Sequence, residues 1–232
     1  MAVFTACATK FLIYLAVCVI VIVTCRLTMN IPQPVFRKML HFIAMTALPF
    51  MIMVGDSWYP PVIILGAMIV IAYPLLAMAE RWSGFAHFFV QKRDGEIKQS
   101  LLDLCIPQIV LTLIFYAWLD LPYVVAAGVL TWGVGDTFAA LIGIKYGRHK
   151  VPFKHADRKK SWEGTIAGGL SSFVTCLAVL LLASPFGLAK SILLALITAP
   201  VSAGVELFSK NGNDTITVSA ANCIVLTLLS LI

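Results

Sequence analysis

Long apolar runs follow one another along almost the whole chain and limit what it can fold into. Crossing ~30 Å of hydrocarbon takes roughly 20 apolar residues in a helix. The chain of 232 residues is 60% hydrophobic and only 12% charged, which excludes a soluble globular domain. Eight apolar runs are separated by turn residues or charges, at 4–25, 39–55, 61–79, 101–119, 122–144, 164–183, 187–207 and 215–232. We therefore expect an integral membrane protein.

The kind of membrane fold follows from backbone hydrogen bonding. Only helices and closed barrels satisfy every backbone polar group in lipid, and the sequence lacks the alternating segments of barrel strands. The expected fold is all-α, a bundle of about eight transmembrane helices that forms a single domain over residues 1–232. No small-x-small cleavage site follows the run 4–25, which favours a transmembrane helix over a signal peptide there.

Basic residues gather in alternate connections between the runs. Fifteen of the 17 Lys and Arg residues follow the first, third, fifth and seventh runs, and seven of them lie in the loop 145–163. Because basic loops stay in the cytoplasm, we expect these loops to face it and both termini to face away. The net charge of +6 is explained in part by this asymmetry, because basic loops also bind anionic lipid headgroups. No nucleic-acid partner is expected.

A carboxylate interrupts the run 122–144. Asp136 lies in the half nearest the basic loop, where an ionised side chain costs roughly 2.5–3.5 kcal/mol unless it faces protein, water or an ion. Small residues recur every four positions beside it and again in the next run, at Gly135, Ala139, Gly143 and Gly147 and at Gly164, Gly168 and Ser172. We expect these two helices to pack closely, with the loop folded over Asp136. The alternative is a structural Asp136 that caps a kink or pairs with a lysine.

The end of the basic loop is typical of an anion site. Ser161 suits a helix N-cap, and Glu163 suits the positive end of the helix dipole. The cations Arg158, Lys159 and Lys160 stand immediately before this helix start, where free backbone N–H groups attract phosphate. The sequence has no P-loop and no Rossmann fingerprint. A carboxylate for Mg²⁺ and cations for phosphate oxygens are nevertheless what phosphoryl transfer requires.

These residues resemble a known family. Gly135-Asp136, Gly143 and Gly147, followed by Lys160–Thr165, look like the core motif of the polyprenol kinases, which include CTP-dependent dolichol, phytol and diacylglycerol kinases and are distantly similar to CDP-diacylglycerol synthases. Three flanking elements also resemble the family: Arg37-Lys38 with His41; Glu80-Arg81 with Arg93 and Glu96; and Glu206 with Asp214–Ser219, where Thr215 and Ser219 replace the family's Asn and Pro.

The resemblance implies transfer of the γ-phosphate of CTP to the hydroxyl of a membrane lipid alcohol at the cytoplasmic face. It implies Asp136, Lys160 and Glu163 as catalytic residues, and Mg²⁺ bound by Asp136, Asp214 and Glu206. The implied nucleotide-binding residues are Lys154, Arg158, Lys159, Lys160, Ser161, Gly164 and Thr165. The implied substrate or second-site residues are Arg37, His41, Glu80, Arg93 and Glu96.

Other functions remain open at this stage. A cytidylyltransferase acting on a phosphorylated lipid would use the same CTP and Mg²⁺ but release pyrophosphate. An ion-coupled transporter would use Asp136, Glu206 and Asp214 as coupling sites, although no inverted repeat is evident. The acceptor, whether polyprenol, phytol-like alcohol or diacylglycerol, and the oligomeric state, including a homodimer, are not specified by the sequence.

Overall fold

The computed structural model describes residues 1–82, 85, 95–152, 160–209 and 214–231. Its secondary structure in these ranges is helical, and the one strand-like contact found there is an isolated bridge between Lys150 and Ser161. The helices are α1 (Ala2–Thr28), α2 (Gln33–Val54), α3 (Tyr59–Ala79), α5 (Glu96–Leu111) continued by the π-helix η1 (Thr112–Trp118), α6 (Pro122–Tyr146), α7 (Trp162–Ala183), α8 (Leu188–Phe208) and α9 (Asp214–Ser230). The expected all-α bundle is confirmed.

Most of these helices are long enough to cross a bilayer. Within the described part of the chain, seven helical spans meet the length and hydropathy of a membrane helix: α1, α2, α3, α5 with η1, α6, α7 and α8. The expected eighth span corresponds to α9, a shorter apolar helix of 17 residues. At 1.5 Å per residue it is about 25 Å long. The chain is a multi-pass membrane protein.

Two helices begin well before their apolar runs. The run 39–55 belongs to a helix that starts at Gln33, and the run 101–119 to one that starts at Glu96. Hydropathy marks only the part of a helix that lies in hydrocarbon, whereas backbone hydrogen bonds carry the helix on into the polar interface. Lys38 therefore stands on a helix, where its direction is fixed, and not in a loop.

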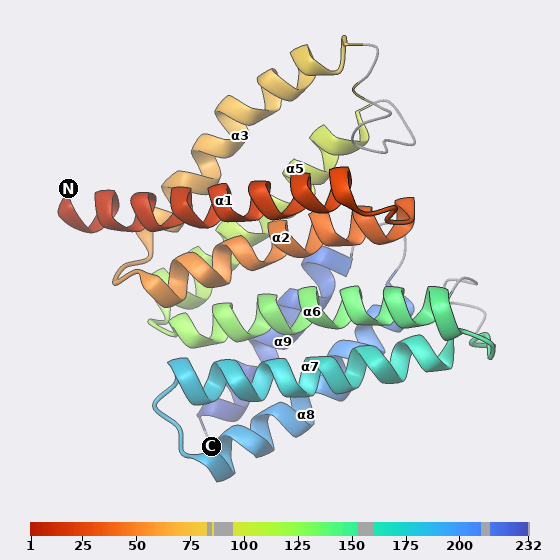
Figure 1. Cartoon of the computed structure of the whole chain (residues 1–232). Coiled ribbons are helices and arrows are strands. Elements are labelled where there is room, and N and C mark those ends of the chain that lie inside the picture. The colour runs from red at the N-terminus through yellow and green to blue at the C-terminus, as the bar shows by residue number, and fades with distance from the viewer. Residues whose placement is uncertain (83–84, 86–94, 153–159, 210–213, 232) are drawn as a thin grey trace.

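The centre of the bundle is α6. It lies between α2 and α7 and also packs against α9 (Figure 1). Its first half is buried, and the large side chain of Trp132 is 1% exposed. Asp136 follows Trp132 by one helical turn and is itself only 7% exposed. A carboxylate is thus held inside the bundle by the helix that most other helices touch.

Small residues bring α6 and α7 into close contact. A Cβ atom added at Gly168 would lie 2.9 Å from Ala139 Cβ, and one at Gly164 would lie 2.6 Å from the Ala139 carbonyl oxygen. A Cβ at Gly135 would overlap the hydroxyl oxygen of Ser172. The predicted packing of the two small-residue stripes is confirmed. The predicted position of the loop over Asp136 lies outside the described residues.

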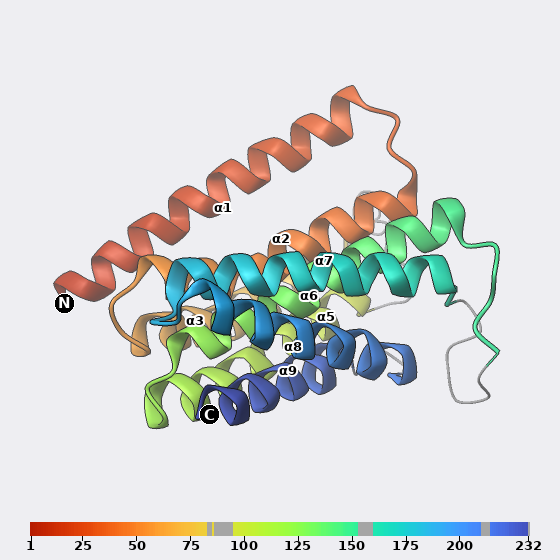
Figure 2. The same ribbon diagram turned by 90° about the horizontal axis from the view of Figure 1, so that it is seen from below.

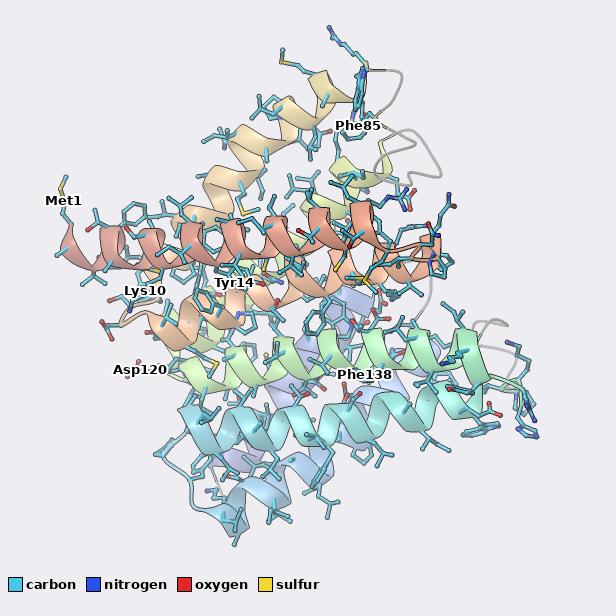
Figure 3. All side chains as sticks on the ribbon, in the orientation of Figure 1. Met1, Lys10, Tyr14, Phe85, Asp120 and Phe138 are labelled. Carbon is cyan, nitrogen blue, oxygen red and sulfur yellow. The ribbon has the colours of Figure 1, made fainter. Side chains whose placement is uncertain are left out.

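The helices α1 and α3 form the outer side of the other half. Figure 3 shows Tyr14 between α1 and α2, where its hydroxyl donates a hydrogen bond of 2.8 Å to the Ile43 carbonyl oxygen. Lys10 of α1 donates to the Val54 carbonyl oxygen at the end of α2 over 2.8 Å. By contrast, α3 diverges from α1 and α2 along its length (Figure 1). This half is less closely packed than the α6–α7 half.

The connections that hold the basic residues lie together. In Figures 1 and 2 the α1–α2 and α6–α7 connections stand at the same end of the bundle. The C-terminal end of α8 and the N-terminal end of α9 point to that end as well. Residues far apart in the sequence can therefore meet there. The cytoplasmic orientation of this end stays a prediction.

Candidate active site

Asp136 is the centre of a small polar cluster between α2 and α6. Lys38 Nζ donates to Asp136 Oδ2 over 2.6 Å, and His41 Nε2 lies 3.6 Å from the same oxygen. Lys38 and His41 are three residues apart on α2, so their side chains leave the same face of the helix. The His41 ring also packs edge-on against Trp132, with centroids 5.9 Å apart. The cluster is held on two sides by rigid helices.

Lys160 joins this cluster from the other side. Its ammonium donates a hydrogen bond to the Glu206 carbonyl oxygen and lies 3.7 Å from Glu206 Oε1. Glu206 in turn interacts electrostatically with Asp136, Lys38 and Asp214 as well as with Lys160. Groups from α2, α6, α8, α9 and the basic loop therefore meet at one end of the bundle. Two ammonium groups and three carboxylates share this space.

The residues after Lys160 hold the start of α7. Ser161 is buried, and its hydroxyl oxygen accepts the Gly164 N–H over 3.2 Å, which confirms the predicted N-cap. Thr165 donates its hydroxyl to the Ser161 carbonyl oxygen over 3.0 Å. A Cβ atom at Gly147 would lie 2.6 Å from Ser161 Oγ, so the glycine allows the loop base to sit against α6. These contacts fix the position of Lys160 just before the start of α7. Direct nucleotide contact by Ser161, Gly164 and Thr165 stays a prediction.

Glu163 contacts the first part of the basic loop. Its Oε1 lies 2.6 Å from His149 Nδ1, and its carboxylate accepts the His149 backbone N–H over 3.2 Å. The Trp162 N–H donates to the His149 carbonyl oxygen over 2.9 Å, and the Val151 N–H donates to the Lys160 carbonyl oxygen over 3.2 Å. The contacts between Glu163 and His149 therefore hold the start of the loop against its end. This is a positioning contact, and the predicted catalytic role of Glu163 stays untested.

Four predicted residues of the loop and its neighbours cannot be placed. Lys154, Arg158, Lys159 and Arg93 lie outside the described residues. The remaining predicted second-site residues form ion pairs between helices. Arg37 of α2 pairs with Glu96 of α5. Lys98 of α5 lies 2.7 Å from Glu80, directly after α3. These two pairs join α2, α5 and α3 at the end of the bundle that holds Asp136.

Lys38 is the residue of this cluster that the sequence does not assign to the site. Its ammonium is nevertheless the cation bonded to Asp136. The available signal was its spacing of three residues from His41, which predicts a shared helix face. That signal was hidden because the apolar run marked this helix as beginning at residue 39. Arg37 lies one position away and turns to Glu96 instead.

A cavity opens beside the cluster. It has a volume of about 730 Å³ and lies between α1, α2, α3 and α5. Arg37, Lys38, His41 and Glu96 line one end of it, and almost all of the remaining lining is apolar. Its apolar walls and few polar groups at one end are the usual composition of a small-molecule pocket. Lys38 and His41 thus face both Asp136 and this cavity.

The donor atoms near Asp136 suit a hard cation. Among the described residues no three His, Cys, Asp or Glu side chains stand close enough to hold a metal ion together. Asp136, Glu206 and Asp214 therefore do not form a ready-made three-ligand site. Mg²⁺ is commonly held by one or two carboxylates together with substrate phosphates and water. Asp136 and Glu206 supply carboxylate oxygens of the kind that such a site uses.

A comparison with curated proteins finds a related kinase. Over 108 residues the chain is 37% identical to a phytol kinase of Synechocystis sp., a match that covers 46% of this chain and 45% of that protein. The chain thus matches about half the length of this relative. The similarity supports a relationship with the polyprenol and phytol kinases. No family model and no solved structure matches the chain.

Proposed function

We propose that this protein is a phosphotransferase that moves a phosphoryl group from CTP to the hydroxyl of a membrane lipid alcohol. The observation that carries the proposal is the shared position of Lys38 and His41, which contact Asp136 on one side and line an apolar cavity on the other. A charged phosphate chain and a hydrocarbon chain can meet only at such a boundary. The similarity to a phytol kinase supports the same reaction.

The carboxylates are assigned to the metal. Asp136, with Glu206 from α8, would hold Mg²⁺, which when bound neutralises charge on the phosphate oxygens. Asp136 is buried among helices that pack without spare room, so its carboxylate is oriented before any ligand arrives. Charge that is oriented in advance in this way makes the largest single contribution to the rate enhancement of many enzymes. The Asp214 carboxylate interacts electrostatically with Glu206 and would add negative charge for the metal to neutralise.

The two lysines are assigned to the phosphates. Lys160 stands directly before the N-terminus of α7 and lies beside Glu206, whereas Lys38 of α2 contacts Asp136. Cations in this position bind phosphate oxygens in the ground state and stabilise the charge that develops during transfer. Each lysine lies beside a carboxylate, Lys38 beside Asp136 and Lys160 beside Glu206. A phosphate chain would replace that contact.

His41 is assigned to the acceptor. Its side chain lines the cavity, so a hydroxyl entering from the apolar side meets the imidazole next to Lys38. Contact with Asp136 and the ring of Trp132 fix its orientation. An imidazole held within reach of a hydroxyl can accept the proton as the oxygen attacks phosphorus. The bond formed is oxygen to phosphorus, and the bond broken joins the γ-phosphorus to the bridging oxygen of CDP.

The choice of CTP and the cytoplasmic position of the site rest on the sequence. The donor follows from the resemblance of Gly135-Asp136 and Lys160–Thr165 to the family motif, since the described side chains contain no evident reader of a base. The cytoplasmic face follows from the basic residues of the loop 145–163. Both parts of the proposal are separable from the phosphoryl transfer itself.

The second candidate is a cytidylyltransferase, which the same charged cluster would also serve. The cavity end favours the kinase, because it offers His41 to an uncharged hydroxyl. The deciding experiment incubates purified protein in lipid nanodiscs with CTP labelled on the γ-phosphate and a panel of lipid alcohols. A kinase places the label in the lipid and releases CDP, whereas a cytidylyltransferase releases labelled pyrophosphate. No transfer with any acceptor or nucleotide would refute the proposal.

A further inference from the structure

We infer that Lys38 is a displaceable internal cation. Its ammonium occupies the metal-binding oxygen of Asp136 until a nucleotide draws it away, so that the protein takes up metal and nucleotide together. The inference deepens the proposed function and rests on it. It gives Lys38 a second task beside phosphate binding, which is to keep a bare metal ion off Asp136.

The Lys38 ammonium and a metal ion compete for the same atom. Lys38 Nζ donates to Asp136 Oδ2 over 2.6 Å, and His41 Nε2 lies 3.6 Å from that oxygen. Mg²⁺ binds a carboxylate oxygen at about 2.0–2.1 Å. A divalent ion and an ammonium that share one oxygen repel each other, and the protein interior screens this repulsion less than water does. Each cation therefore weakens the binding of the other to Asp136.

The two lysines of the cluster are held in different ways. Lys160 donates a hydrogen bond to the backbone carbonyl oxygen of Glu206, an acceptor that is part of helix α8. Within the described part of the chain, the hydrogen-bond acceptor of Lys38 is the Asp136 carboxylate alone. A backbone carbonyl keeps its lysine when a ligand binds, whereas a carboxylate that turns to a metal releases its lysine. Lys38 is therefore the cation of this cluster that a ligand can displace.

Lys38 stands on the open side of Asp136. Its side chain is 27% exposed, whereas that of Asp136 is 10% exposed. Among the described residues, Lys38 and His41 line the cavity beside the cluster and Asp136 does not. A metal ion that approaches from the cavity meets the ammonium and the imidazole before it meets the carboxylate. The flexible four-carbon stem of a lysine lets the ammonium swing aside while the helix stays in place.

The charges of the cluster favour joint binding of metal and nucleotide. Two ammonium groups and three carboxylates leave a single net negative charge when all five groups are ionised. A divalent ion alone would reverse the sign of this charge, and Mg²⁺ gives up its bound water reluctantly. A phosphate chain alone would add several negative charges beside the carboxylates. Metal and phosphate chain together largely cancel each other, so the cluster accepts both more easily than either one.

Displacement of Lys38 links the two ligands. Phosphate oxygens attract the ammonium, which frees Asp136 for the metal, and the metal gains phosphate oxygens as further ligands. Because such coupling is reciprocal, the metal raises the affinity for nucleotide by the same factor. We expect a divalent ion to bind weakly alone and at least about tenfold more tightly with nucleotide, within the ~5–150-fold range that is typical of coupled sites.

The test measures binding of Mn²⁺, which replaces Mg²⁺ and is followed by electron paramagnetic resonance. Purified protein in nanodiscs of zwitterionic lipid is titrated without nucleotide and with a CTP analogue that cannot transfer its γ-phosphate. Lys38→Met removes the ammonium and keeps an unbranched side chain. Its Kd for Mn²⁺ without nucleotide should be about tenfold lower than that of the unchanged protein, or lower still. In thermal unfolding, Mn²⁺ should therefore raise the Tm of Lys38→Met more than that of the unchanged protein.

Two controls separate this effect from a general loss of positive charge. Arg26→Met removes a cation from the last turn of α1, where the guanidinium lies over the ring of Phe36. It should leave the Kd for Mn²⁺ within about twofold, because salt screens a charge that does not contact the metal site. Adding Asp136→Asn to Lys38→Met should abolish the gain, because the freed oxygen is then uncharged. If Lys38→Met does not fold, Lys38→Gln decides by the same titration, since its amide still offers Asp136 a hydrogen bond.

The outcomes separate the inference from the proposed function. Equal Kd values for Mn²⁺ in Lys38→Met and the unchanged protein would overturn the inference. A gain that Arg26→Met reproduces, or that persists after Asp136→Asn is added, would overturn it as well. All three results leave phosphoryl transfer in place, because transfer is assayed separately with γ-labelled CTP. An unchanged protein that phosphorylates no alcohol refutes the proposed function, even where the Mn²⁺ titrations agree with competition at Asp136.

Discussion

The two halves of the bundle differ in how much room their helices leave. Where α6 meets α7, glycine positions such as Gly164 and Gly168 bring the backbones together until even a methyl group would collide. Where α1, α2, α3 and α5 meet, the same bundle encloses about 730 Å³. The closely packed half holds Asp136 in place, and under the proposed function the open half receives the acceptor. Lys38 and His41 stand on α2, the helix between the two halves.

The difference has a physical reason. In lipid, helices gain little from burying apolar side chains, because the surrounding tails are equally apolar. Close contact of backbones through small residues is therefore what stabilises a pair such as α6 and α7. The helices α1, α3 and α5 carry larger side chains, and α3 and α5 are joined at the site end by the Lys98–Glu80 ion pair. Large side chains and pairwise contacts leave space that small residues would close.

The largest expected effect is on the charge at the centre of the closely packed half. Asp136→Asn keeps the shape of the side chain but removes the charge that would hold Mg²⁺, so we expect turnover to fall by roughly a thousandfold without loss of folded protein. Turnover is measured with labelled CTP, and folding by size-exclusion chromatography and thermal unfolding. Asp103→Asn is the matched control, since Asp103 is exposed on α5 and bonds to Gln99.

A structural Asp136 predicts the opposite pattern. In that case Asp136→Asn would either misfold, because the Lys38 ammonium loses its partner, or keep near-normal activity. A folded Asp136→Asn protein with unchanged turnover and unchanged Mg²⁺ dependence would remove the carboxylate from the mechanism. Asp136 would then contribute only to the packing of the α6–α7 half.

The next effect concerns the cations on either side of Asp136. Lys160→Ala should raise KM for CTP and lower kcat, together reducing kcat/KM by about ten- to hundredfold, because an ammonium on transferring phosphates acts before and during the reaction. Lys38→Ala should act in the same direction. Lys190→Ala is the control, since Lys190 lies at the other end of the bundle and bonds to the Ser230 carbonyl oxygen. If kcat/KM falls as much in Lys190→Ala as in Lys160→Ala, the loss reflects a general effect of removing a positive charge.

The packing difference itself can be tested with one methyl group. Gly168→Ala places a Cβ atom 2.9 Å from Ala139 Cβ and should destabilise the protein by about 1–3 kcal/mol. Gly66→Ala in α3 meets no atom within 4 Å and should be neutral or stabilising by about 0.5–1 kcal/mol, because alanine favours a helix. Thermal unfolding in detergent measures both. Equal effects at the two positions would show that the halves do not differ in packing.

Local patterns in the sequence predicted the helices and the contact between α6 and α7. Hydropathy finds a span because length and apolarity are what a bilayer demands, and glycine at every fourth position predicts close approach. The N-cap at Ser161 was predicted for the same reason, since its hydrogen bond depends only on neighbours in the sequence. These features require no knowledge of which helix lies beside which.

Contacts between distant segments were not predictable in this way. The pairing of Lys160 with Glu206 joins residues 46 positions apart, and that of Lys38 with Asp136 joins residues 98 apart. The cavity depends on the arrangement of four helices, and no pattern along any one of them specifies the space between them. The early starts of α2 and α5 were missed because hydropathy does not report helix in the polar interface.

The smallest expected effect lies at the mouth of the open half, where Arg37 pairs with Glu96. Both side chains are partly exposed, so the ion pair itself contributes only about 0.2–1 kcal/mol. If the pair merely joins α2 to α5, Glu96→Arg and Arg37→Glu should each change KM for the lipid by a few fold, and the double variant, which reverses the pair, should restore it.

If Arg37 instead binds phosphate or the acceptor, Arg37→Glu should impair activity more than Glu96→Arg. The double variant should then stay impaired, because a carboxylate cannot replace a guanidinium in binding an anion. Measuring KM and kcat for all three variants at low and high salt separates these cases, since the contribution of a half-exposed pair falls as salt rises. Full restoration would assign Arg37 to the architecture of the cavity and leave the chemistry to Lys38, His41 and Asp136.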